Sequence, residues 1–165
     1  MGQNKRQAAL LLFLFVLYAF FPSNNSPIDS YGYAACIKHA EHLFHPHQLV
    51  YNAFGYIFIK FLSLFNFGFG VLPALKFMNA LFGVASLWVL MRVLKDIGLK
   101  GKESLLAVFI AGVSFGFWRF STENETYIIP IFFSLLGSLY FFRFLKNRRN
   151  AHLILGSSFA SVAAL

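Results

Sequence analysis

The sequence predicts an all-α protein, a polytopic bundle of transmembrane helices with an amphipathic helix at the membrane surface in its first outer loop. The first observation is that 58% of the 165 residues are hydrophobic and 12% are charged, unlike a soluble domain. The second is that the apolar residues form long runs. The third is that Lys and Arg cluster in short stretches between those runs, as the positive-inside rule describes. A net charge of +8 could also indicate nucleic-acid binding, but the clustering of the basic residues between apolar runs argues against that interpretation.

The first apolar run predicts a span over about residues 4–21. Its unbroken apolar part, 8–21, is shorter than the roughly 20 residues that cross a bilayer. The preceding residues extend the helix if Lys5 and Arg6 reach back to the interface. A cleaved signal peptide is the alternative, since the run has a charged start and a suitable apolar length. No small-x-small cleavage site follows directly, so we favour a retained anchor with a cytoplasmic N-terminus.

The next stretch, residues 30–44, has the spacing of an amphipathic helix. The apolar face would consist of Tyr33, Ile37, Ala40 and Phe44. The polar face would consist of Lys38, His39, Glu41 and His42. A helix of this kind lies in the plane of the interface. We expect it to end at His45, because a residue before proline avoids the helical conformation.

Three further spans and the start of a fourth follow. The apolar stretch 49–70 is long enough to cross, but crossing would put the basic cluster after the next helix outside the cell. We therefore expect 49–70 to be membrane-hugging or re-entrant. The remaining spans are expected at about 73–94, 104–120, 127–145 and, as a start, 151–165. Because the last run stops at the last residue, we expect one integral-membrane domain over 1–165, the N-terminal part of a longer protein. Gly112 and Gly116 form a G-x-x-x-G pattern that would let helices approach closely.

The candidate chemical groups are acids in the two predicted outer loops. Asp29 lies in the first loop, and Glu123 and Glu125 lie in the second with Arg119. A carboxylate here can act as a general base or hold a divalent cation, and Arg119 can contact phosphate. The alternatives are that all are solvated loop residues, that Arg119 pairs with Glu123, or that Asp29 is an N-cap of the surface helix. Asn124-Glu125-Thr126 is also a glycosylation sequon.

Four of the five histidines follow Asp29, at His39, His42, His45 and His47. The first three are spaced three residues apart and would lie near one another on one side of a helix, so a metal site is geometrically feasible. We favour a polar interfacial face and assign no metal ligand. Cys36 is the single cysteine, which excludes an intrachain disulfide and a multi-cysteine metal site.

Two stretches carry a resemblance to a known family: the first loop, Pro27-Ile28-Asp29-Ser30-Tyr31-Gly32-Tyr33-Ala34, and the second, Phe117-Trp118-Arg119-Phe120-Ser121-Thr122-Glu123-Asn124-Glu125-Thr126-Tyr127. The chain resembles the N-terminal region of the GT-C polytopic membrane glycosyltransferases, such as protein O-mannosyltransferase-like and aminoarabinose transferase-like enzymes. Many members have two adjacent acids in the first loop, where this chain has Asp29 followed by Ser30.

The resemblance implies transfer of a sugar from a polyprenyl-phosphate-linked donor to an acceptor at the outer face of the plasma (inner) membrane. Asp29 and Glu123 would be the catalytic acids, and Arg119, Glu125, His45 and His47 would bind substrate, with a divalent cation as the one candidate cofactor. The alternative is a non-catalytic polytopic membrane protein, a transporter part or scaffold. Transport would favour charges in mid-span, whereas the expected spans hold almost none, with Lys76 and Arg92 near the ends of the second.

Overall fold

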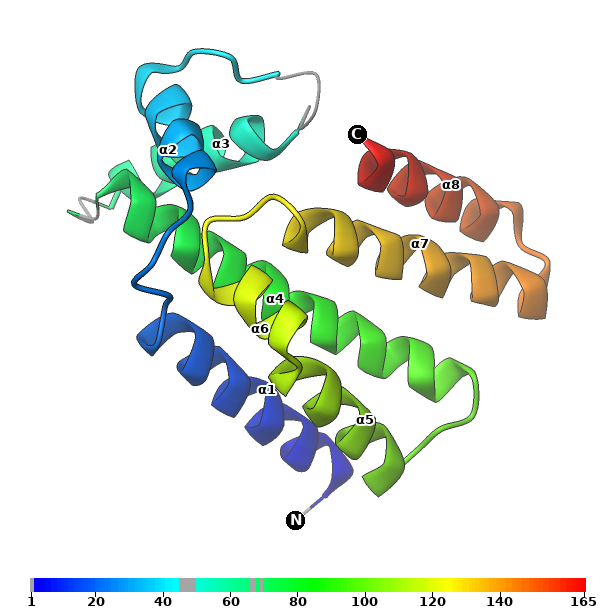
Figure 1. The fold of residues 1–165 in the computed structure, drawn as a ribbon. Coiled ribbons are helices and arrows are strands. Elements are labelled where there is room, and N and C mark those ends of the chain that lie inside the picture. Colours follow the sequence, from blue (N-terminus) through cyan, green and yellow to red (C-terminus); the bar gives the residue numbers. More distant parts are fainter. Residues whose placement is uncertain (1, 45–49, 66–67, 69) are drawn as a thin grey trace.

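The computed structural model describes residues 2–44, 50–65, 68 and 70–165 (Figure 1). All regular structure in this part of the chain is helical, which confirms the expected all-α class. The helices are α1 (Gln3–Phe20), α2 (Ile28–His39), α3 (Tyr51–Ser63), α4 (Val71–Asp96), α5 (Lys102–Val113), α6 (Phe115–Thr122), α7 (Ile128–Asn147) and α8 (Asn150–Ala164).

The 26-residue helix α4 is the centre of the fold. It packs against α1, α5 and α6 on one side and against α7 on the other, while α8 packs on α7 (Figure 1). The short helices α2 and α3 pack on each other and on the N-terminal end of α4. Residues buried on α4 lie on several faces of the helix, as expected for a helix that packs against several others, and the face that carries Leu81 and Trp88 is exposed.

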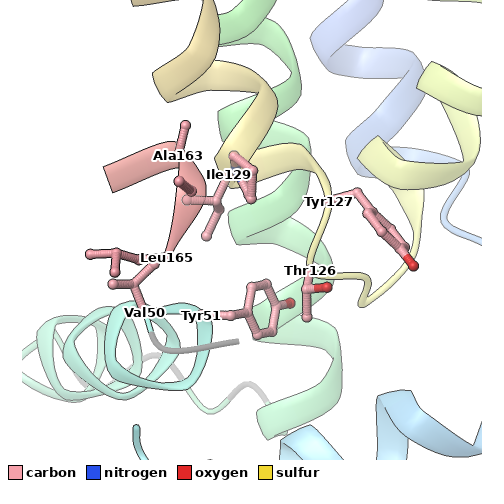
Figure 2. A pocket seen from close by; sticks show the side chains of 9 residues that line it. Val50, Tyr51, Thr126, Tyr127, Ile129, Ala163 and Leu165 are labelled. Atoms are coloured by element: carbon pink, nitrogen blue, oxygen red, sulfur yellow. The ribbon is translucent and has the colours of Figure 1, made fainter. Parts of the chain in front are cut away.

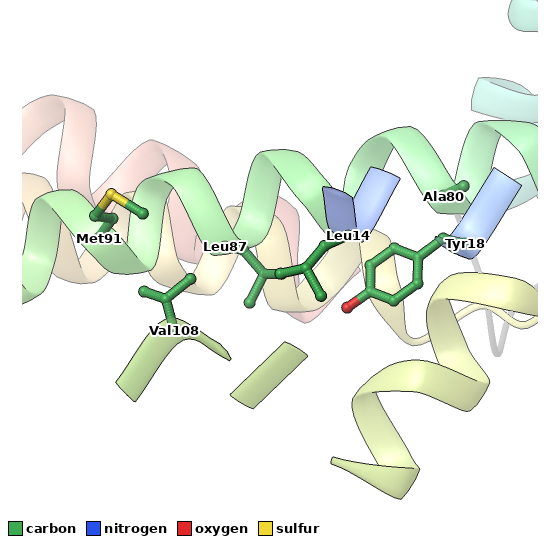
Figure 3. Packing of buried hydrophobic residues seen from close by; sticks show 6 residues of the cluster. All are labelled: Leu14, Tyr18, Ala80, Leu87, Met91 and Val108. Carbon is green, nitrogen blue, oxygen red and sulfur yellow. The ribbon is translucent and has the colours of Figure 1, made fainter. Parts of the chain in front are cut away.

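One hydrophobic cluster joins α1, α4 and α5 (Figure 3). Leu14 and Leu87 are both 0% exposed, and they pack beside Gly112. A Cβ at Gly112 would lie 2.9 Å from Leu14 and 3.0 Å from Leu87, so a larger residue would have to displace the ends of these two side chains. The Tyr18 hydroxyl donates a hydrogen bond of 2.6 Å to the Gly112 carbonyl, which ties α1 to α5.

Two of the described helices, α4 and α7, are long and apolar enough to cross a membrane. The pair α5 and α6 would add a third if it formed one span with a 64° bend. Helix α1 covers the first expected span but starts with five polar or charged residues, so its apolar part is short. The number of crossings and their orientation stay predictions.

The span expected over 104–120 consists of two helices, because Ser114 separates α5 from α6. Ser114 has an extended backbone, with φ −63° and ψ 142°, and its hydroxyl donates to the Ala111 carbonyl at 2.7 Å. A serine that bonds its own backbone in this way competes with the helical hydrogen bonds. The break also puts Gly112 and Gly116 on different helices, and nothing lies within 4 Å of the position of a Cβ at Gly116. The G-x-x-x-G pattern therefore does not form a packing stripe.

Small residues do allow a close approach elsewhere, between α7 and α8. A Cβ on Gly137 would lie 3.2 Å from the Gly156 carbonyl oxygen, and a Cβ on Gly156 would lie 3.3 Å from the Gly137 carbonyl oxygen. The two backbones are thus in contact, which is the geometry that paired glycines permit.

The expected surface helix is present as α2, but it is shorter than 30–44. It ends at His39, because Ala40 adopts the left-handed conformation with φ 57° and the Glu41 N–H bonds back to the Cys36 carbonyl at 2.9 Å. The predicted end at His45 is therefore wrong. Ile37 packs in the core at 2% exposure, whereas Phe44 lies beyond the helix and is 71% exposed. Placement of α2 in a membrane surface stays a prediction.

The segment 49–70 contains α3, a helix of 13 residues. At 1.5 Å per residue α3 is about 20 Å long, short of the roughly 30 Å of a hydrocarbon core. The chain also enters and leaves this region at one end of the bundle, because Lys76 near the start of α4 donates to the Ser23 carbonyl just after α1. A non-crossing segment would need this geometry, and the expectation that 49–70 does not cross the membrane stays a prediction.

Candidate functional site

The two predicted outer loops meet at one end of the bundle. The Ser23 N–H donates to the Thr122 carbonyl at 3.2 Å. Ser30 and Asn124, 94 residues apart, exchange two hydrogen bonds of 2.7 Å: the Ser30 hydroxyl donates to the Asn124 carbonyl, and the Asn124 side-chain amide donates to the Ser30 carbonyl. The first turn of α2 is thereby fixed to the loop between α6 and α7.

Asn124 is the centre of this junction and is 0% exposed. Its side-chain oxygen accepts a hydrogen bond from the Tyr51 hydroxyl, and its N–H donates to Oε1 of Glu123 at 2.9 Å. Each polar group of Asn124 thus has a partner, as a buried polar residue requires. The sequon that begins at Asn124 is not accessible for glycosylation in this conformation.

Glu123 points into the protein and is 1% exposed. Its Oε1 lies 3.2 Å from the Lys76 ammonium, whose side chain is 11% exposed. Burial alone would raise the pKa of Glu123, but the polar groups of Asn124, Ser26, Lys76 and Ser23 outweigh it and bring the pKa below its ordinary value. The alternative that Arg119 pairs with Glu123 is wrong, because Lys76 is the partner.

Two residues of α4, Lys76 and Asn79, hold the second loop, and neither was among the predicted site residues. The Asn79 side-chain amide donates to the carbonyls of Glu123 and Glu125, each at 2.7 Å. Lys76 lies one turn earlier on the same helix and binds Glu123. The signal was present in the sequence, since an amide and an ammonium inside an apolar helix usually have a specific partner.

Glu125, two residues beyond Glu123, is in a different environment. It is half-buried, and burial raises its pKa above the ordinary value of 4.5. Arg119 lowers this pKa, while the charges of Glu123 and Asp29 raise it further. Arg119, Glu123 and Asp29 therefore each lie within electrostatic range of Glu125.

Asp29 lies in the first turn of α2 with an exposed side chain. The N-cap of α2 is Pro27, and no side chain caps the helix. The alternative that Asp29 is an N-cap is therefore wrong, although a carboxylate in the first turn still interacts favourably with the helix dipole. Ser30 is not a cap either, because its hydroxyl bonds Asn124.

Two hollows flank the second loop. One, of about 330 Å³, joins Arg119 with polar groups of Ser23, Asn25 and Thr122 and with the aromatic rings of Phe21, Phe115 and Trp118. The other, of about 200 Å³, lies between Tyr51, Thr126, Ile129 and the end of α8, and Figure 2 shows these side chains around it. Only the first hollow contains a cation.

The structure describes two of the four histidines that follow Asp29 in the first loop. His39 and His42 are exposed, and His45 and His47 lie outside the described residues. In the part of the chain that the structure describes, no three His, Cys, Asp or Glu side chains are grouped as a metal site would need.

Comparison of the chain with protein-family models, with curated proteins and with solved structures finds no match.

Proposed function

We propose that this chain belongs to a membrane glycosyltransferase that moves a sugar from a polyprenyl-phosphate-linked donor to an acceptor at the outer membrane face. The observation that carries the proposal is the grouping of Asp29 with Glu125 and Arg119. These residues come from two loops that are remote in the sequence, and a hydrogen-bonded junction joins the loops. Transfer from a lipid phosphate needs an exposed acid for the acceptor and a cation for the phosphate, and Asp29 and Arg119 both lie within electrostatic range of Glu125.

Asp29 is the proposed general base because it is exposed and because Ser30, its neighbour, is anchored to Asn124. It takes the proton from the acceptor hydroxyl or amine as that oxygen or nitrogen attacks the anomeric carbon. The bond from the anomeric carbon to the phosphate oxygen breaks, and the polyprenyl phosphate leaves with the electron pair. Attack opposite the leaving group inverts the anomeric configuration.

Arg119 is the proposed phosphate contact, since it is exposed and lines the 330 Å³ hollow. Among the residues that the structure describes, it forms no ion pair, so its charge is available to the leaving phosphate. The aromatic rings of the hollow offer an apolar surface to the sugar or the first prenyl unit.

Glu125 is the proposed second acid of the site, because it lies within electrostatic range of Arg119 and Asp29 and because burial raises its pKa above the ordinary value. Glu123, which the family resemblance made catalytic, is better assigned as a positioning residue. It is buried and bound to Lys76, so it has no free surface toward a substrate.

The test is transfer by Asp29→Asn in membranes that contain the whole protein, with a panel of polyprenyl-phosphate sugars as donors. We expect at least about a 100-fold loss of transfer at unchanged membrane insertion. Glu41→Gln is the matched control, since Glu41 is an exposed acid of the same loop, and it should transfer normally. Normal transfer by Asp29→Asn would remove Asp29 from catalysis. No transfer by the unaltered protein with any donor would favour the alternative of a non-catalytic membrane protein.

A further inference from the structure

A basic hollow lies at the opposite end of the bundle, between α1 and the C-terminal part of α4. It has a volume of about 400 Å³. Its polar lining consists of Asn4 and Gln7 from α1 and Arg92 and Lys95 from α4. The lining thus offers two cations and two amides and no acidic side chain, which is the donor set for an anion.

The nearest acid of α4 does not neutralise these cations. Asp96 is the last residue of α4, and its Oδ2 lies 2.9 Å from Nε of Arg143 on α7. The Arg92 guanidinium lies over the Trp88 ring at 4.9 Å, a contact that orients the group and leaves its edge N–H donors free.

An apolar groove continues from the basic hollow along the same two helices. It has a volume of about 510 Å³ and is lined by Leu12 and Phe15 of α1 and by Leu81, Val84 and Ala85 of α4. Leu11 and Trp88 line both the hollow and the groove, so the two are continuous. Leu12 is 63% exposed and Trp88 is 45% exposed, which shows that the groove is open.

The dimensions match one lipid chain. Arg92 and Leu81 lie on the same helix, and at 1.5 Å per residue about 16 Å of helix separates them. One leaflet of the hydrocarbon core is about 15 Å thick. A phosphate at Arg92 would therefore place an acyl chain along the whole groove.

We propose that this face of α1 and α4 binds an anionic phospholipid. The phosphate is held by Arg92 and Lys95 with the amides of Asn4 and Gln7, and one acyl chain lies in the groove beside Leu81 and Ala85. Basic pockets between helices at one membrane face are known to bind such headgroups. The apolar groove distinguishes this ligand from a free phosphate, which would occupy the hollow alone. The proposal does not depend on the glycosyltransferase assignment.

The experiment is native mass spectrometry of the detergent-purified protein titrated with phosphatidylglycerol, phosphatidylcholine or glycerol 3-phosphate. We expect phosphatidylglycerol to bind at least about tenfold more tightly than either of the others, since each Lys or Arg near anionic lipid contributes appreciably to binding. The double variant Arg92→Gln/Lys95→Gln should lose that preference. The matched control is Lys146→Gln/Arg149→Gln, which removes the same charge from exposed positions near the end of α7 and should bind as before.

A second variant separates the headgroup from the chain. Ala85→Phe fills the groove and should weaken phosphatidylglycerol binding at least about fivefold while circular dichroism and elution volume stay unchanged. Two results would overturn the proposal: glycerol 3-phosphate binding as tightly as the lipid, which would mean an anion site without a lipid chain, or an equal loss in both double variants, which would mean attraction by overall charge.

Discussion

The two ends of α4 each carry an ion pair, and the two pairs differ in burial. At the N-terminal end, Lys76 and Glu123 lie 3.2 Å apart with side chains 11% and 1% exposed. At the C-terminal end, Arg143 and Asp96 lie 2.9 Å apart with side chains 34% and 28% exposed. The distances are similar, but the first pair is much less exposed to water than the second.

This difference indicates what each pair does. A buried pair is costly to break because it leaves one charge without water or partner, whereas a partly exposed pair is readily replaced by hydration. The N-terminal pair belongs to a network that also fixes Asn124 and both loops, so it holds the proposed site in shape. The C-terminal pair joins α4 to α7 and leaves Arg92 and Lys95 free for an external anion.

Removing the buried cation should give the largest effect. Lys76→Met leaves the Glu123 carboxylate buried without its counter-charge, and we expect a loss of about 3 kcal/mol or more in the free energy of unfolding. Detergent-based unfolding followed by circular dichroism measures this. Lys102→Met replaces an exposed lysine and should change stability by less than about 0.5 kcal/mol. Equal stability of Lys76→Met and the unaltered protein would mean that the pair contributes nothing.

The pH dependence of stability sharpens the comparison. Because the folded-state pKa of Glu123 is below its ordinary value of 4.5, its contribution is present above pH 4.5 and is lost as the pH falls through the folded-state pKa. Glu125 acts in the opposite sense, since its pKa is raised, so its protonation stabilises the fold as the pH falls. Lys76→Met removes one of the groups that lower the pKa of Glu123, so the pKa should rise and the loss of stability in acid should be smaller than in the unaltered protein.

The measurement is the thermal unfolding midpoint between pH 7 and pH 3.5 for the unaltered protein, Lys76→Met and Glu125→Gln. Glu125→Gln should lose more stability in acid than the unaltered protein, because the opposing contribution is gone. An identical pH profile for all three proteins would contradict the assigned directions.

The smallest effect is expected at the other end of α4. Asp96→Asn removes the charge of the partly exposed pair, and we expect a loss of about 1 kcal/mol or less that shrinks at high salt. The same unfolding assay at low and high ionic strength measures it. A loss as large as that of Lys76→Met would mean that burial does not distinguish the two pairs.

Much of the fold follows from local sequence. The apolar runs predict the ends of α4 and α7 within two residues, because a long apolar run has to form a helix if its backbone hydrogen bonds are to be satisfied away from water. The end of α1 at Phe20 also follows from the sequence, because Phe21 precedes Pro22 and a residue before proline avoids the helical conformation. The apolar pattern does not predict the helix ends at Ser114 and Ala40, because it continues past both residues. The Ser114 hydroxyl bonds the backbone where α5 ends, and Ala40 adopts the left-handed conformation where α2 ends.

The sequence by itself determined which residues are candidates for chemistry, and it placed Asp29, Arg119, Glu123 and Glu125 in two loops that could meet. Only the tertiary structure decided that Glu123 turns inward to Lys76 while Glu125 stays half-buried near Arg119 and Asp29. The two acids are separated by one residue, so no local pattern distinguishes them. Their partners come from helices distant in the sequence, and the packing of α4 against the second loop sets the burial that decides the charge each acid can carry.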